Sequence, residues 1–379
     1  MTVKSARPFH SFWLFFPAAS VWAAVTVPLS IAAVLSGSGW PAGLLGPGHG
    51  HELIFGFALA LVAGYTLGPQ PWRVLGPLFG MWLAARLCWL LAPEALLSQL
   101  LSPAFALLLA WHVVPRFRAA KKWRNKVAGP LILVLCLMAL VYFLIPAGLP
   151  LPAPRTLLQS AIVGLLVLMT FMGGRLLAPA VAGTLDKQGI ALEARVQPRL
   201  EGALLIILCL ALMLSLARAA DPLTGSLLAV AGILILVRTG RWKLWHCTGR
   251  PDLLVLALGY LWLAAGALVS GVHLLAGLPL VPALHLVAVG ALGTLSGSVM
   301  LRLAWQRAHR RQPPAWQVLS LAVLVAIASI CRYLAGPAPF SEPALLWLSA
   351  GSWALAFTAL SIQLLRLFFQ TTQPRSPAP

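Results

Sequence analysis

The chain alternates between long apolar runs and short breaks that hold the charged residues, prolines and glycines. Most runs approach about 20 residues, the length of a helix that crosses the hydrocarbon core of a bilayer. The pattern predicts an all-α, polytopic membrane protein with a bundle of about twelve transmembrane helices. The runs fall at 12–35, 51–68, 74–92, 96–114, 128–146, 157–178, 202–217, 223–237, 253–272, 281–301, 316–335 and 344–368.

Residues 1–369 hold all of these runs and are predicted to form a single transmembrane helical domain. The last ten residues, 370–379, are polar and rich in proline, and we expect a disordered tail there. The first run follows a weakly basic start, which is also typical of a signal peptide. It is long and lacks a clear cleavage site with small residues, so we interpret it as the first helix.

Composition supports a membrane protein and removes nucleic acid as a partner. Hydrophobic residues make up 60% of the chain and charged residues only 9%, whereas soluble domains carry roughly 25% charged residues. A net charge of +19 would indicate nucleic acid binding in a soluble protein. Between apolar spans it indicates basic loops that lie against anionic membrane lipid.

The basic residues gather in alternate loops, and this sets the predicted orientation. Cytoplasmic loops of membrane proteins carry an excess of lysine and arginine. The bias is satisfied if the N-terminus is cytoplasmic, and it predicts a multi-pass inner-membrane protein. The loops then placed inside hold Arg116, Arg118, Lys121, Lys122, Arg124, Lys126, Arg195, Arg199, Arg238, Arg241, Lys243, Arg250, Arg307, Arg310 and Arg311.

Polar residues near the predicted outer ends of the spans are the candidates for function, because ionisable residues in spans are costly and tend to be functional. The order of the spans assigns six such residues from four segments to one outer layer. They are His49, His51 and Glu52 in the second span, Arg86 in the third, His285 in the tenth and Arg332 in the eleventh.

This set of residues suits a b-type haem, which needs imidazole ligands for iron and cationic partners for its two propionates. His51 and His285 are the predicted iron ligands, and Arg86 and Arg332 the predicted propionate partners. We expect Glu52 either to orient a histidine or to cap the helix.

His49 and His51 lie two positions apart, about 200° around a helix. They are therefore not expected to share one metal. His49 is a candidate ligand for a second metal such as copper, or a cap for the second helix. Histidines at the ends of spans also often bond only to water or to a carbonyl group, and that alternative stays open for each of them.

Several motifs around these residues resemble the NnrS family. The stretch GHGHELIFGFALALVAGY (48–65) resembles a family pattern of two histidines and an acid followed by an apolar run. The stretch LHLVAVGALGTLSGSVMLR (284–302) resembles its second signature. Shorter matches in the same order are WLAARL, GGRLL, LGYLW and CRYLA. The resemblance implies a bacterial inner-membrane protein of twelve helices that contains haem and copper and is linked to nitric oxide metabolism or denitrification.

By residue, the resemblance supports His49, His51, Arg86 and His285, and it also marks departures. The family usually has a histidine before the LGY motif and another after the second signature. This chain has Ala257 and Arg307 there. These replacements weaken the expectation of copper and indicate a divergent member.

Other functional classes are alternatives to a haem-binding protein. An oxidase-type copper centre needs further histidines, and this chain has Val287 two positions after His285, so we predict no dioxygen reduction of that kind. A secondary transporter or facilitator without haem is an alternative, although its coupling carboxylates would be expected near the membrane midplane. An accessory protein that assembles a denitrification complex is another. The sequence leaves open whether any reaction is catalysed and which proteins are partners.

Overall fold

The protein is described by a computed structural model covering residues 8–120, 126–147, 149–217, 220–338 and 341–372. Part of the predicted basic run, 121–125, lies outside these residues, as does most of the predicted tail, 373–379. The final helix extends to Thr372 and so includes the first three positions assigned to that tail.

The described chain is almost entirely helical, and it confirms the predicted all-α bundle of twelve spans. Ten helices are long and apolar enough to cross a membrane, and the two other spans are the shorter α7 and the composite helix 47–66. The helices that form single rods are α1 (Phe12–Leu35), α4 (Trp72–Leu91), α5 (Leu96–Arg118), α7 (Ala128–Leu144), α8 (Pro154–Asp186), α9 (Pro198–Ser215), α10 (Asp221–Gly240), α11 (Pro251–Leu275), α14 (Ala315–Leu334) and α15 (Pro343–Thr372).

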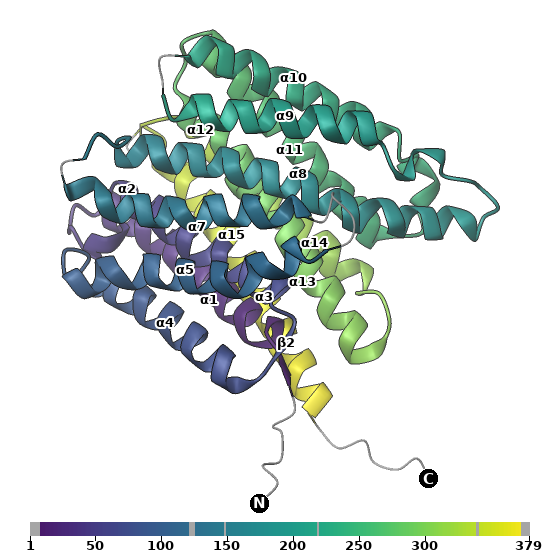
Figure 1. Ribbon diagram of the computed structural model, residues 1–379, viewed down its shortest axis with the longest axis horizontal. Helices are drawn as coiled ribbons and strands as arrows, with labels where there is room; N and C mark the ends of the chain where they lie inside the picture. Colours follow the sequence, from purple (N-terminus) through teal and green to yellow (C-terminus); the bar gives the residue numbers. More distant parts are fainter. Residues whose placement is uncertain (1–7, 121–125, 148, 218–219, 339–340, 373–379) are drawn as a thin grey trace, which may run out of the picture.

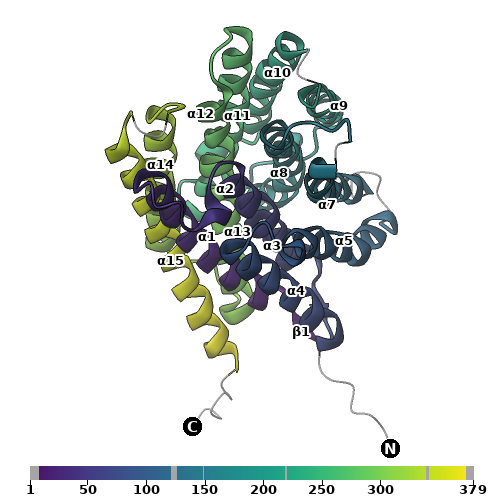
Figure 2. The ribbon, with the colours of Figure 1, turned by 90° about the vertical axis from the view of Figure 1, so that its left-hand side faces the viewer.

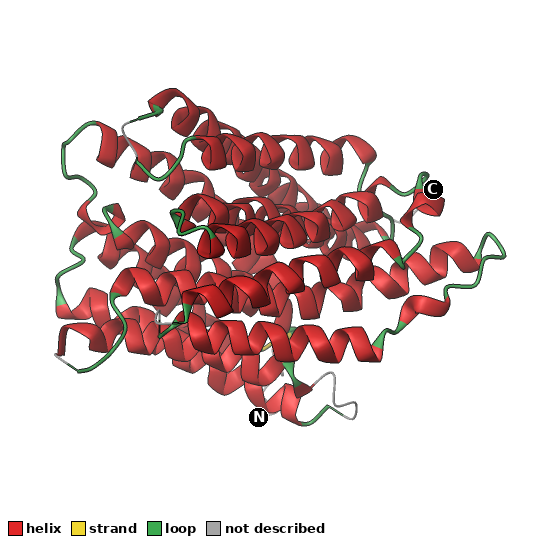
Figure 3. Ribbon diagram, turned by 90° about the horizontal axis from the view of Figure 1, so that it is seen from above, coloured by secondary structure: helices red, strands yellow, loops and turns green. Residues whose placement is uncertain are grey.

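The helices run back and forth in one bundle, with α9 and α10 at one edge and α4 at the opposite edge (Figure 1). Seen from above, nearly all of the described chain is helical (Figure 3). The start of α1 and the end of α15 lie together, since the rings of Trp13 and Phe368 are 5.8 Å apart. An even number of crossings requires both chain ends on one side, and we call that side the terminal face.

A small sheet closes the terminal face. Strand β1 (Phe9–His10) pairs antiparallel with β2 (Pro69–Gln70), which follows the second span. The most deeply buried rods are α8, α11 and 280–309, and α14 and α15 lie to one side of them (Figure 2). The predicted histidine layer lies at the end of the bundle opposite the terminal face.

Two spans are interrupted by a π-helical turn directly after a histidine. The second span consists of α2 (Pro47–His51), the π-helical segment η2 (Glu52–Ala58) and α3 (Leu59–Thr66). The tenth consists of α12 (Leu280–His285), the π-helical segment η6 (Leu286–Ala291) and α13 (Leu292–His309). Isolated π-turns often mark functional sites because they change the direction of side chains.

Several predicted boundaries differ from the structure, and two of the differences follow directly from the residues there. The second span begins at Pro47, one turn before the predicted start, because proline is well suited to a first helical position. Helix α8 runs to Asp186, past the predicted end at 178. The glycine pair Gly173–Gly174 therefore does not end this helix. It lets Tyr260 and Arg238 approach closely, and both donate hydrogen bonds to the carbonyl oxygen of Thr170.

Candidate functional site

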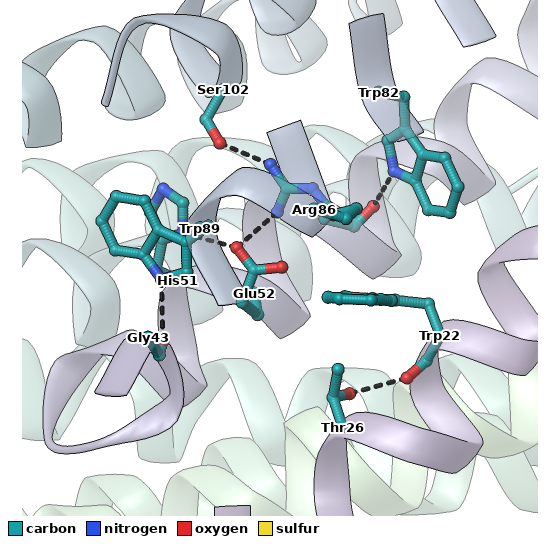
Figure 4. Close-up of polar contacts among 10 residues, drawn as sticks. Trp22, Thr26, Gly43, His51, Glu52, Trp82, Arg86, Trp89 and Ser102 are labelled. Carbon is teal, nitrogen blue, oxygen red and sulfur yellow. Dashed lines mark hydrogen bonds and ion pairs between the residues drawn. The ribbon is translucent and has the colours of Figure 1, made fainter. Parts of the chain in front are cut away.

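A chain of buried polar contacts joins the second span to α4 and α5 (Figure 4). His51 Nδ1 lies 3.0 Å from Glu52 Oε1, and Arg86 Nη1 donates to the same oxygen at 2.7 Å. Arg86 Nη2 donates to the hydroxyl of Ser102. Glu52 and Arg86 are both 0% exposed, so this ion pair is formed entirely inside the protein.

Aromatic rings fix the orientation of His51. Its ring stacks on Trp89 with centroids 3.8 Å apart, and Tyr142 lies 4.9 Å away. Trp89 Nε1 donates to the carbonyl oxygen of Gly43 at 2.8 Å, which ties the loop before α2 to α4. An ionised carboxylate only accepts hydrogen bonds, so His51 donates through Nδ1 and its Nε2 keeps a free lone pair.

The π-helical segment η2 makes room for this arrangement. A side chain at Gly56 would place a Cβ atom 2.6 Å from Arg86 Nη1. Trp82 Nε1 donates to the carbonyl oxygen of Gly56 at 2.9 Å, an oxygen that also accepts from the backbone N–H of Leu59. Glycine is therefore required here because the Arg86 guanidinium lies directly against the backbone.

Three buried polar atoms near the ion pair have no hydrogen-bond partner within the described ranges. They are Glu52 Oε2, Arg86 Nε and Trp22 Nε1. Figure 4 shows Trp22 and Thr26, both from α1, below the Glu52 carboxylate. Buried polar groups are normally satisfied by protein or by ordered water. This group of unmatched donors and acceptors is therefore suited to a water molecule or a small polar ligand.

A second cluster lies on another side of the same span. His285 is within electrostatic range of His49 and Arg332, and His49 is within range of Arg332 as well. His285 Nδ1 lies 2.7 Å from the carbonyl oxygen of Val281, so Nδ1 donates and Nε2 is left as an electron-pair donor. His49 Nδ1 is buried without a partner among the described residues.

The predicted layer thus divides into two groups. His51, Glu52 and Arg86 form one, and His49, His285 and Arg332 form the other. The roughly 200° between His49 and His51 on one helix explains the division. Of the two histidines of the second span, His49 is the one within electrostatic range of His285, while the pairing of His51 with His285 as iron ligands stays a prediction. Arg86, a predicted propionate partner, has Glu52 and Ser102 as its neighbours.

Both alternatives for Glu52 can now be compared with its contacts. The helix begins at Pro47, so Glu52 lies one turn inside it, and no side-chain cap is formed there. Its carboxylate instead contacts His51 and Arg86. Of the two roles expected, orienting a histidine agrees with the geometry and capping the helix was wrong.

Sequence reasoning missed the aromatic neighbours of this site. Trp82 and Trp89 lie four residues before and three after Arg86, which places all three on one face of α4. That spacing is a signal that the sequence carries. Ser102 and Tyr142 come from α5 and α7, and no local pattern connects them to His51 or Arg86.

An apolar cavity of about 140 Å³ lies deeper in the bundle between α3, α8 and α13. Leu292 is the lining residue nearest in sequence to His285, seven residues further on, or about 10 Å along a helix. None of the six predicted site residues lines this cavity. This cavity is therefore not part of the candidate site.

The two clusters differ in what they can hold. His49 and His285 offer two imidazole nitrogens with one nearby cation, a donor set that fits a ligand requiring two nitrogens and a negatively charged group. No group of three or more His, Cys, Asp or Glu residues suited to a metal ion occurs within the described ranges.

Comparison with known proteins gives the family. A family model described as NnrS protein matches residues 9–371, nearly the whole chain. No curated protein matches the chain. The matched region contains both clusters and all twelve spans. The chain therefore belongs to the NnrS family, as its motifs predicted, and is a multi-pass membrane protein related to nitric oxide.

Proposed function

We propose that the protein binds a haem b at the end of the bundle opposite the terminal face and takes part in the nitric oxide response. His285 and His49 are the proposed iron ligands, and Arg332 the proposed partner of a propionate. The observation that carries the proposal is that His49, His285 and Arg332, from three separate segments, lie within electrostatic range of one another at one end of the bundle.

The hydrogen bond of His285 supports the proposed ligand role. A histidine that binds metal through one nitrogen usually donates its other N–H to a carbonyl or carboxylate, which fixes the tautomer. His285 meets this condition through Val281, at 2.7 Å. The π-turn η6 begins at the next residue and sets the direction of the helix below the imidazole.

Within this proposal, the other cluster positions the second span. Arg86 holds Glu52, Glu52 holds His51, and Trp89 covers the His51 ring. These contacts fix η2 and α2, and hence the place of His49 two residues before His51. A bound haem b would supply one-electron chemistry at its iron, while these residues would hold the segment that carries its ligand.

The test is an optical spectrum of purified protein, oxidised and then reduced with dithionite, after expression with excess haem. We expect a b-type spectrum in the wild type that His285→Ala and His49→Ala abolish or shift. His273→Ala is the matched control, because this imidazole lies at the same end but bonds to Pro279 O and Tyr333. It should leave the spectrum unchanged.

Two outcomes would change the assignment. If His51→Ala abolishes the spectrum and His49→Ala does not, His51 is the second ligand. A colourless wild-type protein would refute haem binding and bring forward a facilitator or an accessory protein. The burial of Glu52 in its ion pair with Arg86 already removes that carboxylate as a free group for proton-coupled transport.

A further inference from the structure

A basic pocket lies at the terminal face, at the far end of the bundle from both histidine clusters. It has a volume of about 710 Å³ and is formed where α13 ends, α14 begins and α15 ends. We define the basic pocket by six of its lining residues, Trp305, His309, Arg311, Trp316, Gln317 and Arg366. Nothing in the proposed haem site uses any of them.

The pocket carries positive charge that no acidic side chain balances. Arg311 and Arg366 are exposed, and neither has an ion pair or hydrogen bond within the described ranges. No aspartate or glutamate lines the pocket. The stretches outside the described ranges contain no acidic side chain either. A negatively charged ligand would therefore meet two uncompensated guanidinium groups.

Hydrogen bonds among the neutral lining residues hold the walls of the pocket in place. Trp305 Nε1 donates to Gln317 Oε1 at 2.8 Å, and Gln317 Nε2 donates to Gln363 Oε1 at 2.6 Å. His309 Nε2 lies 3.0 Å from Gln370 Oε1. These bonds connect all three helices, so the pocket is organised before any ligand binds.

The position of the pocket indicates the source of the ligand. It lies at the ends of three membrane-spanning helices, and Trp316 is 63% exposed beside it. Tryptophan favours the boundary between hydrocarbon and water. Basic pockets between helices on the cytoplasmic side of a membrane suit anionic lipid headgroups. The terminal face is the one predicted to be cytoplasmic.

We propose that the basic pocket binds the phosphate of an anionic phospholipid headgroup, with Arg311 and Arg366 as its cationic partners. The glycerol and acyl chains of such a lipid would lie along the apolar sides of α14 and α15. A soluble phosphate compound offers the same chemistry, so the test must separate the two sources.

The experiment is a titration of short-chain phosphatidylglycerol into the full-length protein in a neutral detergent, followed by thermal unfolding. Phosphatidylcholine of equal chain length is the uncharged control. We expect phosphatidylglycerol alone to raise the unfolding temperature. We also expect the double variant R311Q/R366Q to weaken its binding about 30-fold, as expected for two basic residues at an anionic surface.

The matched control is R73Q/R241Q, which removes two exposed arginines of the same face that lie outside the pocket. It should bind phosphatidylglycerol as the wild type does. Equal stabilisation by both lipids, or an equal loss in both double variants, would overturn the proposal. Inorganic phosphate that protects as well as the lipid would assign the pocket to a soluble ligand instead. A haem spectrum plays no part in any of these outcomes.

Discussion

The buried ion pair between Glu52 and Arg86 provides the sharpest quantitative prediction. Its N–O distance is 2.7 Å and both side chains are 0% exposed. At an effective dielectric constant of about 20, two unit charges at this distance attract by about 6 kcal/mol. The desolvation of both groups offsets much of that attraction, so the pair as a whole adds little net stability.

Removal of one partner has a different effect, because it leaves a buried charge without compensation. We expect Arg86→Met to lower the free energy of unfolding by about 3–5 kcal/mol, and Glu52→Gln by a similar amount. The double variant E52Q/R86M should be more stable than either single variant, since no charge is then left alone. The amide that replaces the carboxylate in this variant still offers an oxygen to the Nδ1–H group of His51.

The assay is a double-mutant cycle of unfolding free energies in detergent, with far-ultraviolet circular dichroism as the readout. A matched control is Arg73→Met, because Arg73 is exposed and lies on the same helix. Additive losses, or single-variant losses below about 1 kcal/mol, would refute the claim that this buried ion pair couples the two residues.

Four further predictions rest on other features. Gly56→Ala should destabilise the protein by about 1–3 kcal/mol. The control Gly80→Ala, where a Cβ meets nothing within 4 Å, should stabilise α4 slightly. Equal shifts of the unfolding temperature in the two variants would contradict the close approach of Gly56 to Arg86. Trp89→Leu should lower the unfolding temperature and broaden the spectrum of the proposed haem, because His51 loses its stacked neighbour. An unchanged spectrum would show that the orientation of His51 does not influence the proposed haem site. Burial raises the pKa of the Cys247 thiol. Maleimide labelling of this residue at pH 7 should therefore be slow in the native protein and fast after unfolding. Mass spectrometry of the labelled peptide measures both rates, and equal rates would contradict the prediction. A green fluorescent protein fused after the last residue should fluoresce in bacteria if the terminal face is cytoplasmic, whereas alkaline phosphatase activity at that position would reverse the orientation.

The fold was predictable from the sequence because a bilayer imposes a simple rule. A spanning segment must satisfy its own backbone hydrogen bonds, so apolar runs of sufficient length become helices. All twelve predicted runs correspond to helical spans in the structure. The errors lie in where helices begin and end, as at Pro47, past Gly173 and at His309, where helices begin or continue in polar or glycine-rich sequence.

The candidate residues could also be selected from the sequence, since histidine, arginine and glutamate are rare in apolar spans. Their depths followed from the positions at which the spans begin and end. The prediction of which histidine would meet His285 could not be made in this way. It depends on the rotation of the second span about its own axis, which a list of depths does not contain.

The sequence by itself determined the class of protein, the number of spans and the residues worth examining. Only the tertiary structure decided that His51 is held by Glu52, Arg86 and Trp89 while His49 lies within electrostatic range of His285 and Arg332. The physical reason is that apolarity along the chain decides what enters a membrane, and lipid gives no preference among helix neighbours. Side-chain packing, close approach at Gly56 and the pairing of buried charges select those neighbours.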